Sequence, residues 1–386
     1  MPAKTRDCCE SDACEEARPP VRRRSSRGPL LEDAIPCSEY YPVSIDFERR
    51  SMSFVRIPRS TYKNSAFLVP RHTDMGRSLY SFNLDDLLLR NMSSPLQGAR
   101  THYILISAFC CSTLLARFLD EMANCLVLKE PALVAQLGML RYRKSAMAAG
   151  EWESEWRQLA PVCLGLMNRA FQPEDIVIVK PSDIGNCIGD AILQHDPRSK
   201  AILLSVKLRT FILSVLKSDS RREWTRGRAR FWKGAVDAFS PLAHAEVRQL
   251  DDARLAAYIW LMTNAFWREL RCGAAHSRVL ELDGEEVSDQ PGPTLERVMT
   301  FFDIPFTPQD VVRIVNSAAT SKHSKHPDKQ YDAATRRADL QDWERRFGDQ
   351  ADAAIEWASP IADELGLNDV TGPLAKEASS LAAGAI

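Results

Sequence analysis

Hydroxyl side chains and cations cluster where short apolar runs of this 386-residue sequence end. Ser112 and Thr113 follow the run Thr101-His-Tyr-Ile-Leu-Ile-Ser, at the expected start of a helix. The first backbone N–H groups of a helix have no partner inside the helix, so such an N-terminus suits a phosphate or sulfate group. The same pair is also typical of an ordinary helix cap, the simpler interpretation of these two residues alone.

Cations end two further apolar runs. Lys180 follows Asp175-Ile-Val-Ile-Val, while Lys207 and Arg209 follow Ala201-Ile-Leu-Leu-Ser-Val. A charge at the end of a buried strand is costly unless it has a partner. Strand alternation would place Lys207 and Arg209 on one side, where both could hold a phosphate, and Ser214 in the next helix could reach the same group. The alternatives are a strand-end lysine whose ammonium reaches water and a solvated strand end.

A sheet must position these residues. Four apolar runs, near 101–107, 175–180, 200–207 and 278–283, alternate with helical patterns. This order predicts a three-layer α/β fold with a parallel sheet and helices on both faces, whose ligands bind beyond the carboxyl ends of the strands. Helical insertions are expected at about 135–170 and 220–270.

The chain divides by composition into four parts. Residues 1–40 are rich in charge and poor in apolar residues, which predicts a disordered tail. A small β-containing extension is expected over 41–98, the main domain over 99–371 and a flexible tail over 372–386.

Composition excludes several classes of protein. With 45% hydrophobic and 26% charged residues, the chain can bury a large core, unlike a collagen or a coiled coil. The net charge of −1 gives no overall attraction to nucleic acid or to an acidic membrane. No apolar run approaches the roughly 20 residues of a membrane helix. Ten cysteines without a paired-cysteine metal motif predict reduced thiols, a cytoplasmic location and no metal.

Common nucleotide and hydrolase motifs are missing. The sequence has no GxxxxGK[ST], no GxGxxG and no GxSxG. A nucleotide kinase, a dinucleotide dehydrogenase and an α/β-hydrolase are therefore disfavoured.

Four segments together resemble the sulfotransferase family. The first is Phe109-Cys-Cys-Ser-Thr-Leu-Leu-Ala-Arg117 with Lys129-Glu130-Pro131 after it. Lys180-Pro-Ser182, Lys207-Leu-Arg209 with Ser214, and the block from Leu282 to Pro305 follow in the family's order, so the resemblance covers about 100–335. It implies a P-loop NTPase-like topology and transfer of a sulfuryl group from 3′-phosphoadenylyl sulfate to a hydroxyl or amine of a small-molecule acceptor.

The resemblance also implies which residues form the site. Lys180 would contact the transferring group, with Ser182 and Asp183 beside it. The residues expected to bind the co-substrate are Phe109, Cys110, Cys111, Ser112, Thr113, Lys207, Arg209, Ser214, Lys322, Ser324 and Lys325.

This sequence departs from the family at three positions. Ala108 or Phe109 replaces the family's basic loop residue, Cys111 replaces its glycine, and Ser182 replaces its catalytic histidine. The general base is therefore open between Asp183, Glu130 and a histidine from elsewhere. The alternative function is a catalytically divergent protein of the same fold that binds a nucleotide or a partner.

Aromatic and basic residues interleave from Arg221 to Lys233. The segment could be a nucleic-acid surface, a helix over the co-substrate, or a surface helix with Trp224 and Trp232 buried. Packing is the favoured interpretation, and no nucleic-acid partner is expected.

Overall fold

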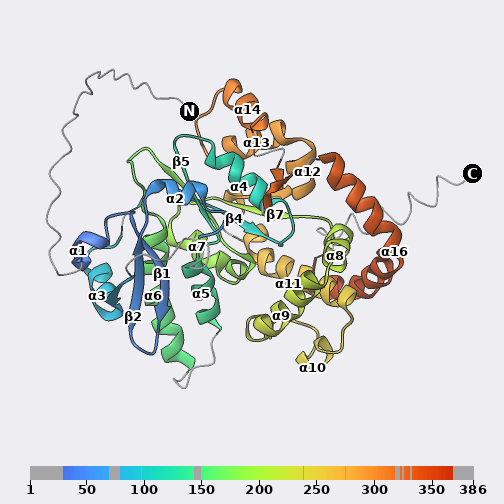
Figure 1. The fold of residues 1–386 in the computed structure, drawn as a ribbon. Coiled ribbons are helices and arrows are strands. Elements are labelled where there is room, and N and C mark those ends of the chain that lie inside the picture. The colour runs from blue at the N-terminus through green and yellow to red at the C-terminus, as the bar shows by residue number, and fades with distance from the viewer. Residues whose placement is uncertain are drawn as a thin grey trace, which may run out of the picture.

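A five-stranded parallel sheet forms the centre of the protein (Figure 1). The computed structural model describes residues 29–68, 79–96, 98–142, 149–237, 239–273, 275–317, 322–323, 326–330 and 333–367. The sheet has the order β5-β6-β4-β7-β8. The first strand, β4, is central: β5 and β6 lie on one side of it, and β7 and β8 lie on the other. This arrangement confirms the predicted α/β fold and its P-loop NTPase-like topology. The strands are β4 Thr101–Ile106, β5 Cys125–Lys129, β6 Ile176–Lys180, β7 Ala201–Ser205 and β8 Val279–Asp283.

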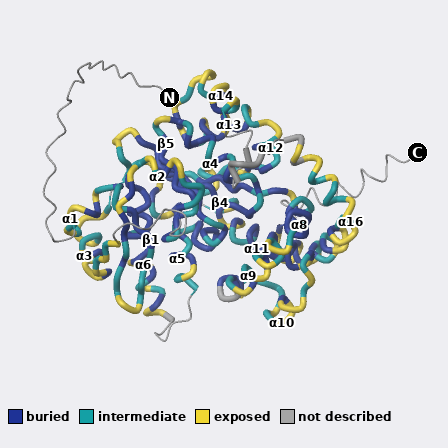
Figure 2. Tube along the Cα trace, in the orientation of Figure 1, coloured by how far each residue is buried: buried dark blue, intermediate teal, exposed yellow. Residues whose placement is uncertain are grey.

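Helices and a second sheet cover the two faces of this sheet. Alternate residues of β4 point to opposite faces: Ile104 and Ile106 join one buried cluster, and Tyr103 and Leu105 join the other. Figure 2 shows the buried residues concentrated around the strands. The first face is covered by α4 Ser112–Asp120, α8 Leu208–Leu216, α9 Asp219–Val236, α11 Asp252–Cys272, α12 Gly284–Asp289, α13 Pro291–Phe301, α14 Pro308–Val315 and α16 Ala333–Glu364. The second is covered by α5 Ala132–Arg141, α6 Ala149–Met167, α7 Gly189–His195 and part of α11.

One strand was not predicted. Cys125–Lys129 is a five-residue run that is buried throughout, and periodicity cannot distinguish such a run from a piece of buried helix. It pairs with β6 in parallel, with Lys129 opposite Lys180. The edge of the sheet next to the Lys180 loop was therefore missing from the prediction.

A small antiparallel sheet packs on the second face. It has the order β1-β2-β3, with β1 Tyr40–Asp46, β2 Ser51–Arg56 and β3 Leu79–Asn83. Between β2 and β3, the described residues 65–68 form no strand, and the Leu68 N–H donates to the Lys129 carbonyl at 2.7 Å. Nearby helices are α2 Arg59–Asn64 and α3 Leu84–Ser93.

Residues 29–40, which were predicted to belong to a disordered tail, pack on the domain. They include α1 Leu31–Ala34, and Ala34 and Ile35 are buried. The buried guanidinium of Arg169 donates to the carbonyls of Ala34, Ile35, Cys37 and Tyr40, at 2.7–3.1 Å. A single cation satisfying four carbonyls holds this segment on the domain. The remainder of the predicted tail, 1–28, and the predicted C-terminal tail, 372–386, lie outside the described residues.

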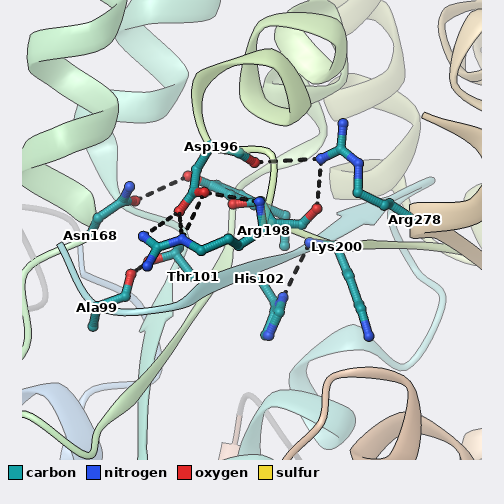
Figure 3. A network of polar contacts seen from close by, with 10 residues as sticks. Ala99, Thr101, His102, Asn168, Asp196, Arg198, Lys200 and Arg278 are labelled. Carbon is teal, nitrogen blue, oxygen red and sulfur yellow. Dashed lines mark hydrogen bonds and ion pairs between the residues drawn. The ribbon is translucent and has the colours of Figure 1, made fainter. Parts of the chain in front are cut away.

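Polar contacts tie the amino ends of β4 and β7 together (Figure 3). His102 is fully buried, accepts from the Lys200 N–H at 3.1 Å, and stacks on Phe302. Burial lowers the pKa of His102 to about 4, so the ring is neutral at pH 7. Because it lies at the end of the sheet opposite to the ligand-binding end, His102 is not a candidate base.

The remaining elements are short connections. They comprise α10 His244–Val247, the 3-10 helices η2 Asp183–Ile188 and η3 His276–Arg278, and the pair β9 Lys322–His323 and β10 His326–Gln330. Over the described residues, no helix is both long and apolar enough to cross a membrane. The cytoplasmic location stays a prediction.

Candidate active site

A cavity of about 240 Å³ lies beyond the carboxyl ends of β4 and β6. Its walls come from the loop after β4, the end of β5, the start of η2, the α8–α9 region and α16. The lining residues are Ile106, Ala108, Phe109, Cys110, Cys111, Ser112, Thr113, Glu130, Ser182, Asp183, Thr210, Ser214, Lys217, Arg221, Trp224, Leu340 and Trp343.

The loop after β4 has an unusual backbone. Ala108, Phe109 and Cys111 have φ values of 64°, 53° and 60°, in the left-handed region that non-glycine residues rarely adopt. Such strain clusters at functional sites, where the surrounding structure maintains it. Helix α4 begins at Ser112, as predicted, so its first turn faces the cavity together with the hydroxyls of Ser112 and Thr113.

Gly284 packs closely against the backbone of this loop. A Cβ at this position would meet the Cys110 carbonyl oxygen at 2.3 Å and the Cys110 carbonyl carbon at 2.7 Å. The N-terminus of α12 can therefore approach the loop backbone only because residue 284 has no side chain.

Lys180 forms an ion pair instead of facing the cavity. Its Nζ lies 2.6 Å from Oε1 of Glu130, and its side chain is only 1% exposed. The ammonium also lies 5.9 Å from the centroid of the Phe67 ring. The sequence left two interpretations of Lys180, a contact with the transferring group and an ammonium that reaches water. The ammonium is buried against Glu130, and Glu130, not Lys180, lines the cavity. Lys180 therefore contacts a residue of the cavity wall without lining the cavity itself.

A second carboxylate lies on the same wall. Asp183 pairs with Arg228, whose Nη2 donates to Oδ1 at 2.9 Å, and both side chains are nearly buried. Burial raises the pKa of Asp183 to about 6, against the opposing effect of Arg228. The neighbouring Ser182 Oγ is buried and has no hydrogen-bond partner among the residues that the structure describes.

Another part of the cavity wall is cationic and aromatic. Arg221 donates to the Ser214 carbonyl at 2.9 Å and contacts Ser214 Oγ. Its guanidinium lies 4.3 Å from the centroid of Phe109, and Phe109 meets Trp224 edge-on. Lys217 Nζ lies 3.8 Å from the ring centroid of Trp343.

The expected pairing of Lys207 with Arg209 is wrong. Strand β7 ends at Ser205, and Lys207 is the N-cap of α8, so strand alternation does not extend to Arg209. Neither residue lines the cavity. Arg209 bonds Glu344 and Asp352 of α16 instead. Ser214 is the one member of the predicted trio that lines the cavity.

The remaining residues that were predicted to form the site lie partly on the cavity and partly outside the described residues. Phe109, Cys110, Cys111, Ser112 and Thr113 all line the cavity, as do Ser182 and Asp183. Lys322 lies in β9, and its side chain is not described; Ser324 and Lys325 lie outside the described residues.

Residues 250–359 match the family model of the sulfotransferase domain. This segment is therefore similar to the sulfotransferase domain family. A search of curated proteins finds no match.

Solved sulfotransferase structures superpose loosely on the chain. The sulfotransferase domain of the curacin biosynthetic pathway is 14% identical, with a TM-score of 0.38, covering 65% of this chain and 98% of its own. For the sulfotransferase domain of the Synechococcus PCC 7002 olefin synthase the values are 15%, 0.34, 57% and 79%. For a Mycobacterium avium sulfotransferase they are 14%, 0.34, 69% and 84%.

The matched segment 250–359 contributes one part of the cavity wall. It contains β8, α12 with Gly284, and the part of α16 that places Leu340 and Trp343 on the cavity. The loop 107–111 and Glu130 precede the matched segment and meet it only through the fold.

Sequence reasoning missed three side chains of the cationic wall: Lys217, Arg221 and Trp343. The interleaved segment from Arg221 was interpreted chiefly as packing. Trp232 is indeed fully buried, whereas Trp224 and Arg221 line the cavity. The three-residue spacing of 221 and 224 was the available signal, because it places both positions on one face of α9.

Proposed function

We propose that the protein transfers a sulfuryl group from 3′-phosphoadenylyl sulfate to a hydroxyl or amine of a small-molecule acceptor. The observation that carries this proposal is the cavity itself. It brings together the strained loop with the start of α4, the cationic wall, and the carboxylates of Glu130 and Asp183. The loop with the start of α4 and the cationic wall both favour anionic groups. The carboxylates offer a base for the proton of the acceptor.

Glu130 is the base that the geometry supports best. Its carboxylate is 25% exposed and lines the cavity, while Lys180 orients it from the protein side. Asp183 is more deeply buried, and both of its oxygens face Arg228. Among histidines whose side chains are described, none lines the cavity.

The proposed step balances as a displacement at sulfur. The acceptor oxygen or nitrogen forms a bond to sulfur as the bond between sulfur and the bridging phosphate oxygen breaks. The acceptor proton passes to Glu130, and adenosine 3′,5′-bisphosphate leaves with the bridging oxygen. The first turn of α4 with Ser112 and Thr113 would stabilise the charge that develops on the departing phosphate.

A second cavity is a candidate binding site for the acceptor. It has a volume of about 320 Å³ and lies beside η2, the short helix that begins at Asp183. The two predicted helical insertions both line it, through Arg141 and Tyr142 on one side and Phe239 and Phe266 on the other. Aromatic walls with a few polar groups are typical of small-molecule sites.

The alternative is a nucleotide-binding protein without transferase activity. The loop lacks a cation of its own, and Ser182 stands where the family has its catalytic histidine. Isothermal titration with adenosine 3′,5′-bisphosphate tests binding. Transfer of radiolabelled sulfuryl from 3′-phosphoadenylyl sulfate to pooled phenols, alcohols and amines tests catalysis, with Glu130→Gln as the inactive control. Binding without any transfer by the unmodified protein would favour the alternative.

A further inference from the structure

Three cavities follow one another along residues 182–194, which include η2 and α7. Residues 182–183 line the first cavity, and residues 186–187 and 190 line the second. Residues 190 and 193–194 line a third cavity, with a volume of about 530 Å³. This stretch therefore leads from the proposed site of transfer to the third cavity, over roughly 20 Å at the usual rise per residue of such helices.

The three cavities adjoin one another. The second and the third share four lining residues, Asp190, Arg268, Glu269 and Leu270. Asn186 lines the second cavity, and its Nδ2 donates at 2.9 Å to the carbonyl of Ile106, which lines the first. A molecule in the second cavity therefore lies close to the site of transfer and can extend into the third.

The lining becomes more apolar with distance from the site of transfer. Phe239 and Phe266 line the second cavity beside its charged residues, and Leu193, Leu270 and Ala275 line the third. An apolar chain that reaches the third cavity would bury more surface than a single ring in the second. The row of cavities thus favours a long acceptor.

Arg268 is a cation at the junction of the second and third cavities. Its Nη1 donates to the Leu365 carbonyl at 3.0 Å, and it forms no ion pair with a carboxylate of the described residues. The other cations of these two cavities are engaged: Arg141 pairs with Asp190, and Arg278 donates to three backbone carbonyls. The remaining N–H groups of Arg268 can therefore bind an anionic group of a ligand.

Glu269 limits how much negative charge the junction accepts, because its carboxylate lines the same two cavities. A single carboxylate or sulfate group can pair with the Arg268 guanidinium, whereas a nucleotide with several charges would also be repelled by Glu269. The first cavity differs, since Lys217 and Arg221 both line it.

We infer that the acceptor is an elongated, largely apolar molecule with a single anionic group, which Arg268 binds. Its hydroxyl or amine lies at Glu130 in the first cavity, its body follows η2 and α7, and its anionic group reaches the junction. The inference rests on the proposed function and names the class of acceptor, with Arg268 as the residue that determines specificity.

Chain-like probes of matched chemistry test the inference. The long acids are 12-hydroxydodecanoate and 16-hydroxyhexadecanoate, the short acid is 6-hydroxyhexanoate, and the uncharged chain is 1,12-dodecanediol. Isothermal titration into protein saturated with adenosine 3′,5′-bisphosphate measures affinity, and transfer from 3′-phosphoadenylyl sulfate measures kcat/KM. The wild type should prefer the long acids to both comparison compounds by about 10-fold or more, the usual effect of a hydrogen bond to a charged group.

Substitutions at the junction and in the third cavity should change this preference. Arg268→Ala should lower affinity and kcat/KM for the long acids by about 10- to 100-fold and remove their advantage over the diol. Arg268→Lys should retain part of it, since the charge remains without the fork. Ala275→Phe narrows the third cavity and should weaken binding of 16-hydroxyhexadecanoate more than that of 12-hydroxydodecanoate.

Arg254→Ala is the matched control. Arg254 lies on the same helix, α11, pairs with Asp251 at the surface and lines none of the three cavities, so every value should stay at that of the wild type. Thermal unfolding of each variant identifies misfolding. If Arg268→Ala does not fold, Arg268→Gln and Arg268→Lys compare a neutral with a charged side chain.

The outcomes separate this inference from the proposed function. If pooled phenols or short alcohols are sulfated and the long acids have no advantage, or keep it in Arg268→Ala, the inference is wrong and the function stands. Equal losses for the acids and the diol would mean that Arg268 only holds Leu365 in place. If the long acids bind through Arg268 but no acceptor is sulfated, the proposed function fails, and the junction is a ligand site without an acceptor role.

Discussion

The ammonium of Lys180 lies 2.6 Å from the carboxylate of Glu130 where β5 and β6 end side by side. The backbone repeats this contact, because the Glu130 N–H donates to the Lys180 carbonyl at 2.7 Å. Glu130 has a φ of 53°, so its unusual backbone turns it toward this neighbour. A nearly buried cation therefore pairs with Glu130, the more exposed of the two carboxylates that line the cavity.

Lys180 and Glu130 should act as a unit in turnover. Glu130→Gln removes the proposed base and should lower turnover by about 10²- to 10⁴-fold. Lys180→Met keeps the stem but removes the orienting charge, and we expect a loss of about 10²-fold. Turnover of the double variant should be no lower than that of Glu130→Gln alone, since each substitution disrupts the same ion pair.

The measurement is steady-state transfer with an acceptor identified from the pooled assay, alongside titration with adenosine 3′,5′-bisphosphate. Affinity for the spent nucleotide should change little in any of the three variants. Full turnover by a folded Lys180→Met protein would show that the ion pair only supports the structure.

Asp183 should make stability depend on pH. Its folded pKa is raised to about 6 by burial, above the usual value of about 3.9. Between about pH 4 and pH 6 the folded state keeps a proton that the unfolded state has lost, so the free energy of unfolding falls as pH rises through this window. Urea unfolding should show this fall in the wild type and not in Asp183→Asn. A rise of wild-type stability relative to the variant would mean that Arg228 dominates.

Arg209 should hold α16 over the cavity. Its guanidinium bonds Glu344 and Asp352, while Leu340 and Trp343 of the same helix line the cavity. Arg209→Ala should weaken binding of adenosine 3′,5′-bisphosphate and of adenosine 5′-monophosphate equally. A double-mutant cycle with Glu344→Gln should give a coupling of about 0.2–1 kcal/mol, because the pair is partly exposed. A loss confined to the bisphosphate would restore Arg209 as a phosphate ligand.

Gly284→Ala should disturb the loop after β4. The added methyl group would overlap the Cys110 carbonyl, and such overpacking costs about 1–3 kcal/mol of folding stability. Nucleotide affinity should fall as well, since the loop must shift. Gly227→Ala is the control: nothing lies within 4 Å of its added Cβ, and in the interior of α9 it should stabilise by about 0.5–1 kcal/mol. Equal stability of the two variants, measured by urea unfolding, would contradict the close approach.

The segment 29–40 should contribute to stability, contrary to the sequence-based prediction for residues 1–40. Deleting residues 1–40 removes buried Ala34 and Ile35 and leaves the Arg169 guanidinium without its four carbonyl partners. We expect a decrease in melting temperature of several degrees, because one unsatisfied buried group alone costs about 1–3 kcal/mol. Deleting only 1–28 is the comparison, since that part has few apolar residues to bury. Identical melting temperatures for the two deletions would show that Arg169 finds other partners.

The sequence by itself determined the parallel sheet and the loop that carries the site. Long apolar runs such as Thr101–Ile106 can be buried only between two layers, and the hydroxyls after the first run mark the start of α4. These signals are local, so the sequence could predict them. The same is true of Ser182 and Asp183, which follow an apolar run directly.

Only the tertiary structure decided which charges meet. Whether Lys180 faces a ligand or Glu130 depends on the pairing of β5 with β6, and β5 has no distinctive pattern of its own. Arg209 lies near Lys207 in the sequence but binds α16, more than 130 residues later. Arg221 reaches Phe109 because α8 and α9 fold back over the loop. Charge pairing depends on distances between segments remote in the chain, and no spacing along the sequence encodes those distances.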